Sequence, residues 1–585
     1  MTRLAIIRKS ECNPMGCGEY LCGKVCPINR KGELCIKPDP VDKKAQIDEQ
    51  LCIGCGICPN RCPFSAIDII NLPEELKKDP IHRYGQNGFA LYSLPAPMFG
   101  KVVGVLGVNG IGKSTAIKIL AGVLKPNLGR LEGEASYDEL LQFFKGTEAQ
   151  SFFERVRDGK IKTSYKPQQI DFIPKQFSGT ISELLRKADQ KGIFDKVVTE
   201  LELKNILDNE IRSISGGELQ RVAIAATVMK DANLFIFDEP TSYLDIKQRI
   251  KVSRFIRGLA NESTAVLVIE HDLIILDYIT DLVHIMYGKE GAYGVVSLPK
   301  TTRTGINIFL DGYLKEENIR FRDYPIKFAA KPPVQKASKE VQCTWENVQK
   351  TLGKFELAAE SGEIHKNDVI GVLGENGIGK TSFVKILAKV DELDKGTVNE
   401  KVTVSYKSQY LEGSEEIVMT VLGDALEKYD AQIMRPLNIK PLLMKKLNEL
   451  SGGELQRVAI ALCLSKKSDL YLLDEPSAYL DVEQRIRVSK IIADNMEHKG
   501  TSALVVDHDL LFLDYLSKKL IVFEGIPAIK GTVKGPFDMQ EGMNRFLSSL
   551  DITMRRDEES LRPRINKLGS QKDREQRSAN KLYYV

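Results

Sequence analysis

The sequence contains the same phosphate-binding pattern twice. Residues 107–115 and 374–382 both read G-x-x-x-x-G-K-[ST], which is the P-loop motif. The glycines of such a loop let backbone N–H groups surround phosphate oxygens, with a helix N-terminus behind them. We therefore expect two nucleotide sites, with these binding residues: Asn109, Gly110, Gly112, Lys113, Ser114 and Thr115; Asn376, Gly377, Gly379, Lys380, Thr381 and Ser382.

Each P-loop is followed by an S-G-G-E sequence and then by an apolar run that ends in two carboxylates. A Ser with Glu three residues later is a capping box, so a helix begins there and directs free N–H groups outward as an anion site. Of the two carboxylates, the Asp is placed to hold Mg²⁺ and the Glu to polarise an attacking water. The residues concerned are Ser215, Gly217, Glu218, Asp238 and Glu239 in the first copy, and Ser451, Gly453, Glu454, Asp474 and Glu475 in the second.

The flanking sequence predicts how these residues are positioned. Apolar runs at 102–106 and 369–373 precede the P-loops, and helix-like runs at 116–124 and 383–390 follow them. Each motif therefore lies on a strand–loop–helix turn. The expected fold class is α/β, with two P-loop nucleotide-binding domains in tandem.

Nine of the eleven cysteines lie between residues 12 and 62. The second group has the spacing C-x2-C-x2-C-x3-C-P of bacterial ferredoxins, in which the fourth Cys ligates the other cluster. The first group keeps the C-x3-C-P ending but has longer gaps before it. We infer a small ferredoxin-like α+β domain with two [4Fe–4S] clusters, one held by Cys52, Cys55, Cys58 and Cys26, the other by Cys12, Cys17, Cys22 and Cys62.

Zinc and disulfides are the alternatives for these cysteines. Zinc sites usually present separated C-x2-4-C pairs, and a reducing cytosol disfavours disulfides. Iron–sulfur is therefore the preferred interpretation, and Cys35 is left over as a buried thiol.

Composition sets broad limits. The chain has 585 residues, is 43% apolar and 28% charged, and has a net charge of +4, which is typical of a globular protein of several domains. It has neither an apolar run long enough to span a membrane nor a secretory signal. We expect a cytoplasmic protein without a membrane segment, and a basic C-terminal tail that is solvated, the alternative being a tail that contacts a polyanion.

The first copy is longer than the second between the P-loop and the capping box. Most of the additional residues lie at about positions 134–160. Ser136-x-x-Glu139 and Thr147-x-x-Gln150 each look like a capping box ahead of apolar residues at helical spacing. We predict a helix–loop–helix insert that binds a partner, the alternative being a neutral surface insertion.

The predicted domain boundaries follow from these features. We expect a ferredoxin-like domain at 1–72, a first nucleotide-binding domain at 73–300, a hinge at 301–345, a second nucleotide-binding domain at 346–543, and a C-terminal hinge and basic tail at 544–585. Tyr84 and Phe89 precede the first P-loop strand and are candidates to stack on a nucleobase.

The order P-loop, Gln, S-G-G-E, D-E-P, L-D, His occurs in both copies and resembles the nucleotide-binding domain of the ATP-binding-cassette (ABC) class. The resemblance implies that the copies work as a head-to-tail pair within one chain, so that each P-loop faces the S-G-G-E helix of the other copy. It also implies a catalytic role for two histidines and a place for two glutamines at the nucleotide and its Mg²⁺. The magnesium set is Ser114, Gln168, Asp238, Thr381, Gln409 and Asp474, and the histidines are His271 and His508.

A two-cluster head, two cassettes in one chain and an insert in the first cassette alone look like subfamily E of the ABC ATPases, the RNase L inhibitor family. That resemblance implies a monomeric ATPase that splits ribosomes into subunits after termination or rescue. It would contact the small subunit, its rRNA and its ribosomal proteins. It would act with a release factor or the stalled-ribosome relative of that factor, and cassette closure would move the iron–sulfur domain.

Two other functions fit parts of the sequence. In an electron-transfer protein, ATP would gate reduction of a partner through the clusters, although no second redox cofactor motif is found. In an assembly scaffold, nucleotide would only lock the shape, and the two D-E-P glutamates would be dispensable.

Overall fold

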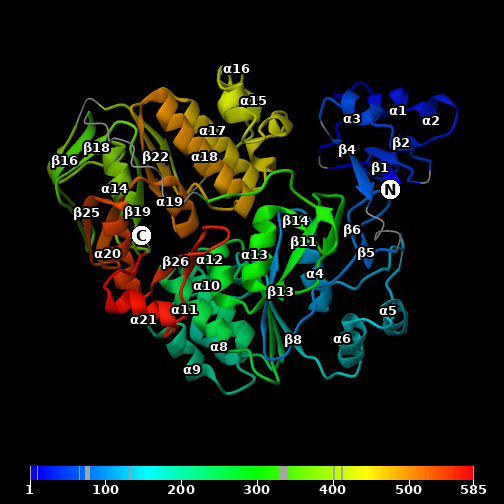
Figure 1. Ribbon diagram of the computed structural model, residues 1–585, viewed down its shortest axis with the longest axis horizontal. Coiled ribbons are helices and arrows are strands. Elements are labelled where there is room, and N and C mark those ends of the chain that lie inside the picture. Colours follow the sequence, from blue (N-terminus) through cyan, green and yellow to red (C-terminus); the bar gives the residue numbers. More distant parts are fainter. Residues whose placement is uncertain are drawn as a thin grey trace. The chain divides into compact units, whose positions relative to one another are not determined.

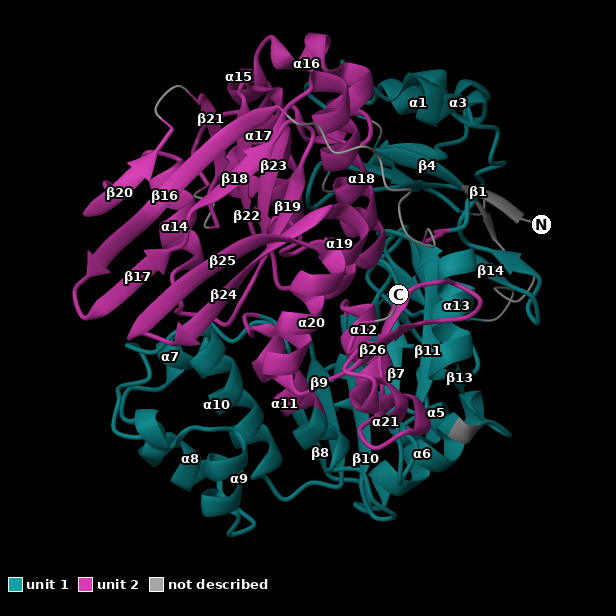
Figure 2. Ribbon diagram, turned by 60° about the vertical axis from the view of Figure 1, so that its left-hand side comes forward, with its two compact units in different colours: residues 1–242, 254–270, 279–325 teal, residues 243–253, 271–278, 326–585 magenta. Residues whose placement is uncertain are grey.

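The structure is a computed structural model that describes residues 2–9, 11–49, 51–64, 66–72, 79–131, 133–328, 340–399, 402–409 and 413–583. Figure 1 shows the order of the elements along the chain. The chain divides into two compact units, coloured in Figure 2. Unit 1 comprises residues 1–242, 254–270 and 279–325, and unit 2 comprises 243–253, 271–278 and 326–585.

The cysteine-rich head forms a small α+β fold within unit 1. Strand β1 (Thr2–Ile7) pairs antiparallel with β4 (Ile67–Leu72), and β2 (Ile36–Pro38) pairs with β3 (Ala45–Ile47). Three short helices complete the head: α1 (Leu21–Val25), α2 (Pro27–Arg30) and α3 (Ile57–Arg61). The short helices bring most of the cysteines of both groups into one apolar core with Ala5, Ile36 and Ile47.

The first P-loop lies in a mainly parallel sheet of unit 1. The parallel strands run in the order β11 (Leu282–Lys289), β7 (Val102–Leu106), β10 (Ala265–Ile269), β9 (Leu234–Asp238) and β8 (Thr163–Lys166). Every residue of β7, β9 and β10 is buried, as expected for parallel strands covered on both faces. The sheet continues through β5 (His82–Arg83), β6 (Ala90–Leu91), β12 (Tyr293–Val296) and β13 (Lys300–Thr301). Here β6 and β12 pair parallel, whereas β5 with β6, and β12 and β13 with β11, pair antiparallel.

Helices cover this sheet and supply its functional ends. Helix α4 (Lys113–Leu120) follows the P-loop, and α10 (Gly216–Val228) begins at the capping box and packs on β8 and β9. Further helices of unit 1 include α7 (Ile173–Gln176), α8 (Ile181–Ala188), α9 (Phe194–Glu200) and α13 (Thr302–Asp311). Helix α11 (Ile246–Arg257) begins in unit 2 and ends in unit 1, and α12 (Leu273–Ile279) lies almost wholly in unit 2.

The insert of the first copy forms the predicted pair of helices, α5 (Tyr137–Phe143) and α6 (Glu148–Arg157). The Ser136–Glu139 capping box is present. The second predicted box is not formed, because the Thr147 hydroxyl donates to the Phe144 carbonyl at 2.7 Å instead of capping α6. Stacking of Phe144 on Phe153, with ring centroids 5.2 Å apart, joins the two helices.

The second copy repeats the parallel sheet within unit 2. Its parallel strands run in the order β24 (Lys519–Ile526), β19 (Val369–Leu373), β23 (Ser502–Val506), β22 (Leu470–Asp474) and β21 (Val404–Lys407). A mainly antiparallel extension, in which only the β17–β25 pair is parallel among the described pairs, contains β16 (Val341–Leu352), β17 (Phe355–Ala359), β18 (Gly362–His365), β20 (Lys395–Val398) and β25 (Lys530–Asp538). The main helices are α14 (Lys380–Leu387), α17 (Gly452–Ser465), α18 (Val482–Lys499) and α19 (Leu510–Leu516), with the short α15 (Val418–Leu422) and α16 (Ala425–Lys428).

Two predicted boundaries fall inside elements. Strand β16 crosses the expected boundary at 345/346, and α20 (Met539–Leu550) crosses the one at 543/544. The expected hinge at 301–345 begins with α13, which packs on β11. Residues 73–78 and 329–339, where we expected linker, lie outside the described residues.

The C-terminal tail is folded rather than solvated, so that expectation was wrong. It forms the hairpin β26 (Met554–Arg556) and β27 (Pro563–Ile565), followed by α21 (Gln571–Ser578). The tail is anchored by Asp573, which accepts a 2.7 Å hydrogen bond from the Thr553 hydroxyl. Composition alone missed this because buried ion pairs hold the basic residues: Arg562 Nη1 lies 3.0 Å from Asp277 Oδ2. Among the described residues, no helix is both long and apolar enough to span a bilayer.

The single tryptophan gives a test of packing in unit 2. Trp345 is 1% exposed, and its ring meets Phe383 edge-on with centroids 5.4 Å apart. We expect Phe383→Ala to leave a cavity and cost about 3–5 kcal/mol, which lowers the urea midpoint of the Trp345 fluorescence transition. Leu352→Ala, at a 40% exposed position of β16, should change the free energy of unfolding by about 0.5 kcal/mol or less. Equal shifts for the two variants would contradict this packing.

Candidate functional site

The first P-loop has the conformation that its glycines predict. Gly110 and Gly112 have φ of 76° and 87°, and a Cβ on Gly112 would lie 2.3 Å from the Phe89 ring. Lys113 is buried, and its ammonium donates to the carbonyls of Gly107 and Val108 at 2.9 and 2.7 Å. The loop therefore holds the lysine at the N-terminus of α4, where a phosphate would also bind.

The second P-loop has the same geometry. Gly377 and Gly379 have φ of 74° and 90°, and Lys380 donates to the carbonyls of Gly374 and Glu375 at 2.9 and 2.6 Å. Burial lowers the pKa of Lys380 to about 8. A phosphate would restore the preference for the charged lysine by adding an opposite charge.

The hydroxyl after each lysine meets the Asp that ends the neighbouring strand. Thr381 Oγ1 donates to Asp474 Oδ2 at 2.9 Å, and Ser114 lies near enough to Asp238 to influence the pKa of that carboxyl. Both carboxylates are buried, and burial raises their pKa above the usual value. A hydroxyl beside a buried carboxylate is a donor set that fits Mg²⁺, so the residues present fit the ion expected from sequence.

The glutamates that follow these aspartates are held in a strained backbone conformation. Glu239 and Glu475 have φ of 47° and 48°, values that are uncommon for residues other than glycine. The predicted glutamines meet these glutamates: Gln168 Nε2 lies 2.6 Å from Glu239 Oε1, and Gln409 Nε2 lies 2.7 Å from Glu475 Oε1. Matching strain at one position of both copies points to a functional constraint.

Four buried side chains, which we did not predict from the sequence, donate hydrogen bonds to the backbone carbonyls of the two Asp-Glu pairs. Lys166 and Lys407 donate to the Asp238 and Asp474 carbonyls at 2.9 and 2.7 Å. Two glutamine side-chain amides donate to the glutamate carbonyls, Gln220 to Glu239 at 2.7 Å and Gln456 to Glu475 at 2.6 Å. The signal that could have found them is their repetition, since Tyr-Lys and Leu-Gln recur at matching places in both copies.

His508 lies next to the glutamate of the second copy. Its Nε2 atom is 3.6 Å from Glu475 Oε1 and has no hydrogen-bond partner among the described residues. Burial lowers the pKa of His508, and burial together with Asp507 and Asp474 raises the pKa of Glu475 to about 7. His271, the counterpart in the first copy, is buried in unit 2.

Both predicted capping boxes are present. Ser215 and Ser451 each accept from the backbone of the Glu three residues later, and each Glu accepts from the Ser backbone at 2.8 Å. The glycines between them are needed for space in the second copy, because a Cβ on Gly453 would lie 2.9 Å from the Tyr479 carbonyl oxygen. Helices α10 and α17 therefore begin where the S-G-G-E motif predicts.

The segment after the first D-E-P motif contacts the second P-loop within unit 2. Asp245 Oδ2 accepts from Asn376 N at 2.9 Å, and Lys247 Nζ pairs with Glu375 Oε1 at 2.8 Å. We did not predict this contact from the sequence, because it joins residues more than a hundred positions apart. Residues of the first copy's sequence thus form part of the wall of the second P-loop.

The two candidate base-stacking aromatics lie in different surroundings. Phe89 packs beneath Gly112 and Gly294, whereas Tyr84 is 49% exposed with its hydroxyl 3.4 Å from Thr115 Oγ1. Tyr84 is therefore the residue available to a base beside the first P-loop. In the second copy Phe355 packs against Gly379 and Gly531 as Phe89 does in the first, a correspondence that we did not predict.

The cysteines of the head line two separate cavities. The lining of the first includes Cys26, Cys35, Cys52, Cys55 and Cys58. The lining of the second includes Cys12, Cys17, Cys22 and Cys62. The predicted sets, with their exchanged fourth members, are brought together in this way, and four thiolates around one cavity fit a [4Fe–4S] cluster. Cys35 is buried as expected, but it also lines the first cavity.

The head is joined to the first P-loop through the turn between β11 and β12. Gly291 N donates to Gly110 O at 3.0 Å, and Ala292 packs with Ile6 of β1. Asn87 Nδ2 donates to Ile47 O at 3.0 Å, and Arg83 pairs with Glu49. One turn therefore contacts both the phosphate-binding loop and the cysteine-rich head.

Comparisons with known proteins identify two families in the chain. The ABC transporter family matches residues 98–242 and 357–478, and the 4Fe-4S binding domain matches 45–68. ABC transporter E family member 1 of Arabidopsis thaliana is 46% identical, covering 100% of this chain and 99% of that protein.

Two solved structures are similar over most of the chain. A structure described as a model of ribosome-bound archaeal Pelota and ABCE1 has a TM-score of 0.94 and 51% identity, covering 100% of this chain and 99% of that one. A crystal structure of archaeal ribosomal stalk protein aP1 with the ribosome recycling factor aABCE1 has a TM-score of 0.83 and 50% identity, covering 88% and 100%. The fold and the two P-loop sites define a tandem ABC protein with a 4Fe–4S head. Within that class, the chain belongs to the E family, as its full-length identity shows.

The position of Tyr84 gives a test of base stacking. In a Lys380→Ala background, which removes the second P-loop lysine, Tyr84→Ala should weaken binding of a fluorescent ATP analogue about tenfold, or about 1.4 kcal/mol, because stacking is lost. Tyr137→Ala removes a similarly exposed ring from α5 and should leave the Kd unchanged. An unchanged Kd for Tyr84→Ala would exclude the stacking role.

Proposed function

We propose that this protein is an ATP hydrolase that splits ribosomes into subunits after termination or rescue. The observation that carries the proposal is the contact of Asp245 and Lys247 with the second P-loop. Because residues that follow the first D-E-P motif line the second phosphate site, nucleotide there is linked to the position of the first copy. The relatives named above supply the ribosomal context.

The hydrolysis chemistry follows from the residues around each P-loop. Lys380 stabilises negative charge on the terminal phosphates, and the backbone N–H groups of the loop hold them in place. Glu475 has a pKa of about 7, close to neutral, so it can polarise a water and accept its proton. His508 Nε2, beside Glu475, is placed to contact the γ-phosphate or that water. Bound Mg²⁺, held by Thr381 and Asp474, would neutralise phosphate charge.

Closure of the two copies depends on the γ-phosphate. The N-termini of α10 and α17 present N–H groups and positive dipole, which gain little from closure unless an anion faces them. We infer a head-to-tail pair, in which residues 215–218 complete the second P-loop and residues 451–454 the first. Hydrolysis or release then removes the anion and lets the pair reopen.

The iron–sulfur head acts as the moving part. The two [4Fe–4S] clusters would cross-link short helices that have little other core, and this makes the head rigid. The β11–β12 turn, which contacts both Gly110 and the head, transmits a change at the first P-loop. Exposed apolar residues near the cysteines, Met15 and Ile53 at 92% and 62% exposure, offer a surface for a protein factor.

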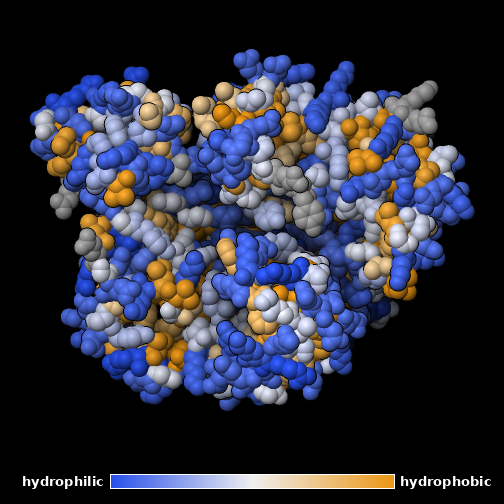
Figure 3. Space-filling model, turned by 180° about the vertical axis from the view of Figure 1, so that it is seen from behind, coloured by the Kyte–Doolittle hydropathy of each residue, from blue (hydrophilic) through white to orange (hydrophobic). Residues whose placement is uncertain are grey.

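The partners follow from the relatives and from the surface. The head would meet a release factor or its stalled-ribosome relative, and the α5–α6 insert would contact the small subunit with its rRNA and proteins. On the face drawn in Figure 3, hydrophobic side chains form small separate groups among hydrophilic ones, which suits a polar, charged partner such as a ribosome. Such a factor works in the cytoplasm as a monomer with an internal domain pair.

The double variant Glu239→Gln with Glu475→Gln tests the role of hydrolysis. We expect it to bind ATP, to remain closed on the small subunit, and to lose multiple-turnover splitting by at least a hundredfold, because the water is no longer polarised. Sucrose-gradient sedimentation of ribosomes with the protein, ATP and a release factor measures both effects. Normal repeated splitting would contradict the mechanism and favour a scaffold.

Iron content tests the cluster assignment. The intact chain should hold about eight iron atoms, and Cys52→Ser should lose about half of them, because one cluster loses a ligand. Cys35→Ser is the matched control from the same cavity and should retain both clusters. Iron loss in the control would overturn the ligand set. Cluster reduction that tracks ATP turnover would instead support electron transfer.

A further inference from the structure

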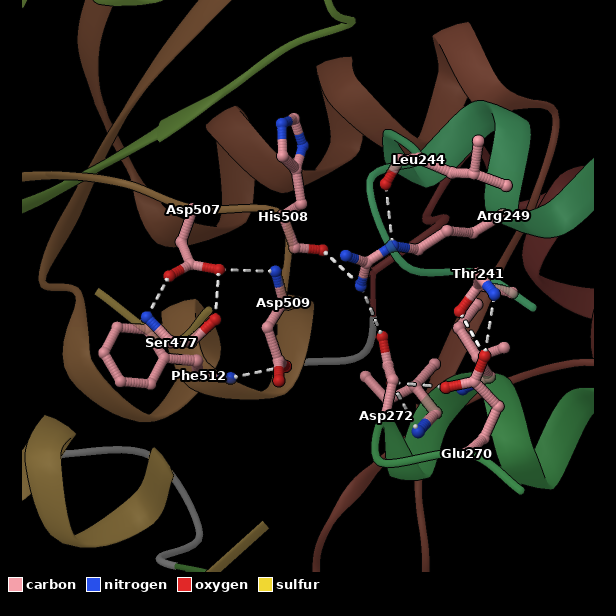
Figure 4. Close-up of polar contacts among 12 residues, drawn as sticks. Thr241, Leu244, Arg249, Glu270, Asp272, Ser477, Asp507, His508, Asp509 and Phe512 are labelled. Atoms are coloured by element: carbon pink, nitrogen blue, oxygen red, sulfur yellow. Dashed lines mark hydrogen bonds and ion pairs between the residues drawn. The ribbon is translucent and has the colours of Figure 1, made fainter. Parts of the chain in front are cut away.

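Unit 2 contains a buried group of two arginines and two aspartates, shown in part in Figure 4. Arg249 Nη1 lies 3.0 Å from Asp272 Oδ2, and Arg485 Nη1 lies 2.6 Å from Asp509 Oδ2. The side chains of the four residues are between 3% and 15% exposed. Charges at this depth persist only when their partners are well placed.

The two pairs come from equivalent places in the two copies. Each arginine lies in the helix after the L-D motif, and its Nε donates at 2.8 Å to the leucine carbonyl of that motif, Leu244 for Arg249 and Leu480 for Arg485. Each aspartate directly follows the histidine expected to be catalytic. The duplicated sequence therefore ties each L-D segment to its own histidine loop.

One further contact joins the two pairs. Arg249 Nη1 also reaches the carbonyl oxygen of His508, at 3.4 Å, so that a single guanidinium meets the histidine loops of both copies (Figure 4). The pKa of Asp272 is raised by burial and next by Asp509, which agrees with two neighbouring carboxylates. Arg485, which pairs with Asp509, supplies the other positive charge.

The same helix also reaches the other side of the second nucleotide site. Asp245 and Lys247, four and two residues before Arg249, contact Asn376 and Glu375 of the P-loop. The start of this segment therefore contacts both the phosphate-binding loop and the backbone of His508. A movement of residues 243–253 would shift both together.

We propose that Arg249 is a positioning residue that fixes the backbone of His508 and makes hydrolysis at the second site depend on the histidine loop of the first copy. The proposal rests on the proposed ATPase function and adds to it a physical link between the sites. A planar guanidinium suits this role, because it donates to a carboxylate and a carbonyl at once with fixed geometry. Coupling of two sites requires an element of this kind whose position both sites influence.

Site-specific ATP turnover tests the proposal with Arg249→Lys, which keeps the charge and loses the planar fork. In a Glu239→Gln background, where only the second site hydrolyses, we expect kcat to fall roughly tenfold or more with KM nearly unchanged, because His508 is misplaced. In a Glu475→Gln background, the effect on the first site should be several times smaller. The assay uses no ribosomes, so its result does not depend on whether the chain splits them.

A control variant and a second test variant distinguish a positioning role of Arg249 from a general loss of stability. Arg257→Lys alters another ion-paired arginine of α11, whose Nη2 lies 2.8 Å from Asp281 Oδ1, and should leave kcat unchanged in both backgrounds. Asp272→Asn removes the other partner of Arg249 and should reproduce the loss of kcat at the second site. Unfolding followed by Trp345 fluorescence should give the same urea midpoint for Arg249→Lys and Arg257→Lys. An unchanged second-site kcat in Arg249→Lys, or equal losses in both backgrounds, would overturn the proposal.

Discussion

Each candidate nucleotide site is organised around the free N–H groups at the start of a helix, which attract an anion such as phosphate. Both P-loops hold their glycines at positive φ so that the backbone can surround an anion. The lysine of each loop is already surrounded by carbonyls, as the contacts of Lys380 with Gly374 and Glu375 show. An anion would balance the buried ammonium, which is why the proposed closure of the two copies depends on bound phosphate.

Two connections join the P-loops to other parts of the chain. Segment 243–253 brings Asp245 to the second P-loop and Arg249 to the backbone of His508. The β11–β12 turn links Gly110 of the first P-loop to the cysteine-rich head. These connections use backbone atoms and buried charges, which tolerate little displacement before they are lost. Under the proposed function, these are the contacts through which a change at a phosphate site would reach other parts of the chain.

Much of this arrangement follows from the sequence, because the motifs fix backbone conformation locally. The P-loop glycines, such as Gly110, predict positive φ, and the structure has it. The capping boxes at Ser215 and Ser451 predict two helix starts, and both helices begin there. The ferredoxin spacing predicts that the cysteines gather in two groups, and they line two cavities. The lysines and glutamines that donate to the backbone of the Asp-Glu pairs were not predicted. In the sequence Lys166 looks like an ordinary charged residue, and only the structure shows that it is buried and donates to the Asp238 carbonyl. The tail was mispredicted for the same reason, since composition cannot show that Arg562 is buried against Asp277.

The central claim is that ATP draws the two copies together so that each completes the phosphate site of the other. Dyes attached through non-natural amino acids at Asp208 and Glu392, both exposed, would report this by single-molecule energy transfer without disturbing the cysteines. With Glu239 and Glu475 both replaced by glutamine, the account predicts a shorter distance in ATP than in ADP, and a return to the longer distance when Lys113 and Lys380 are also replaced by alanine. The same distance distribution in ATP, in ADP and without nucleotide would contradict it.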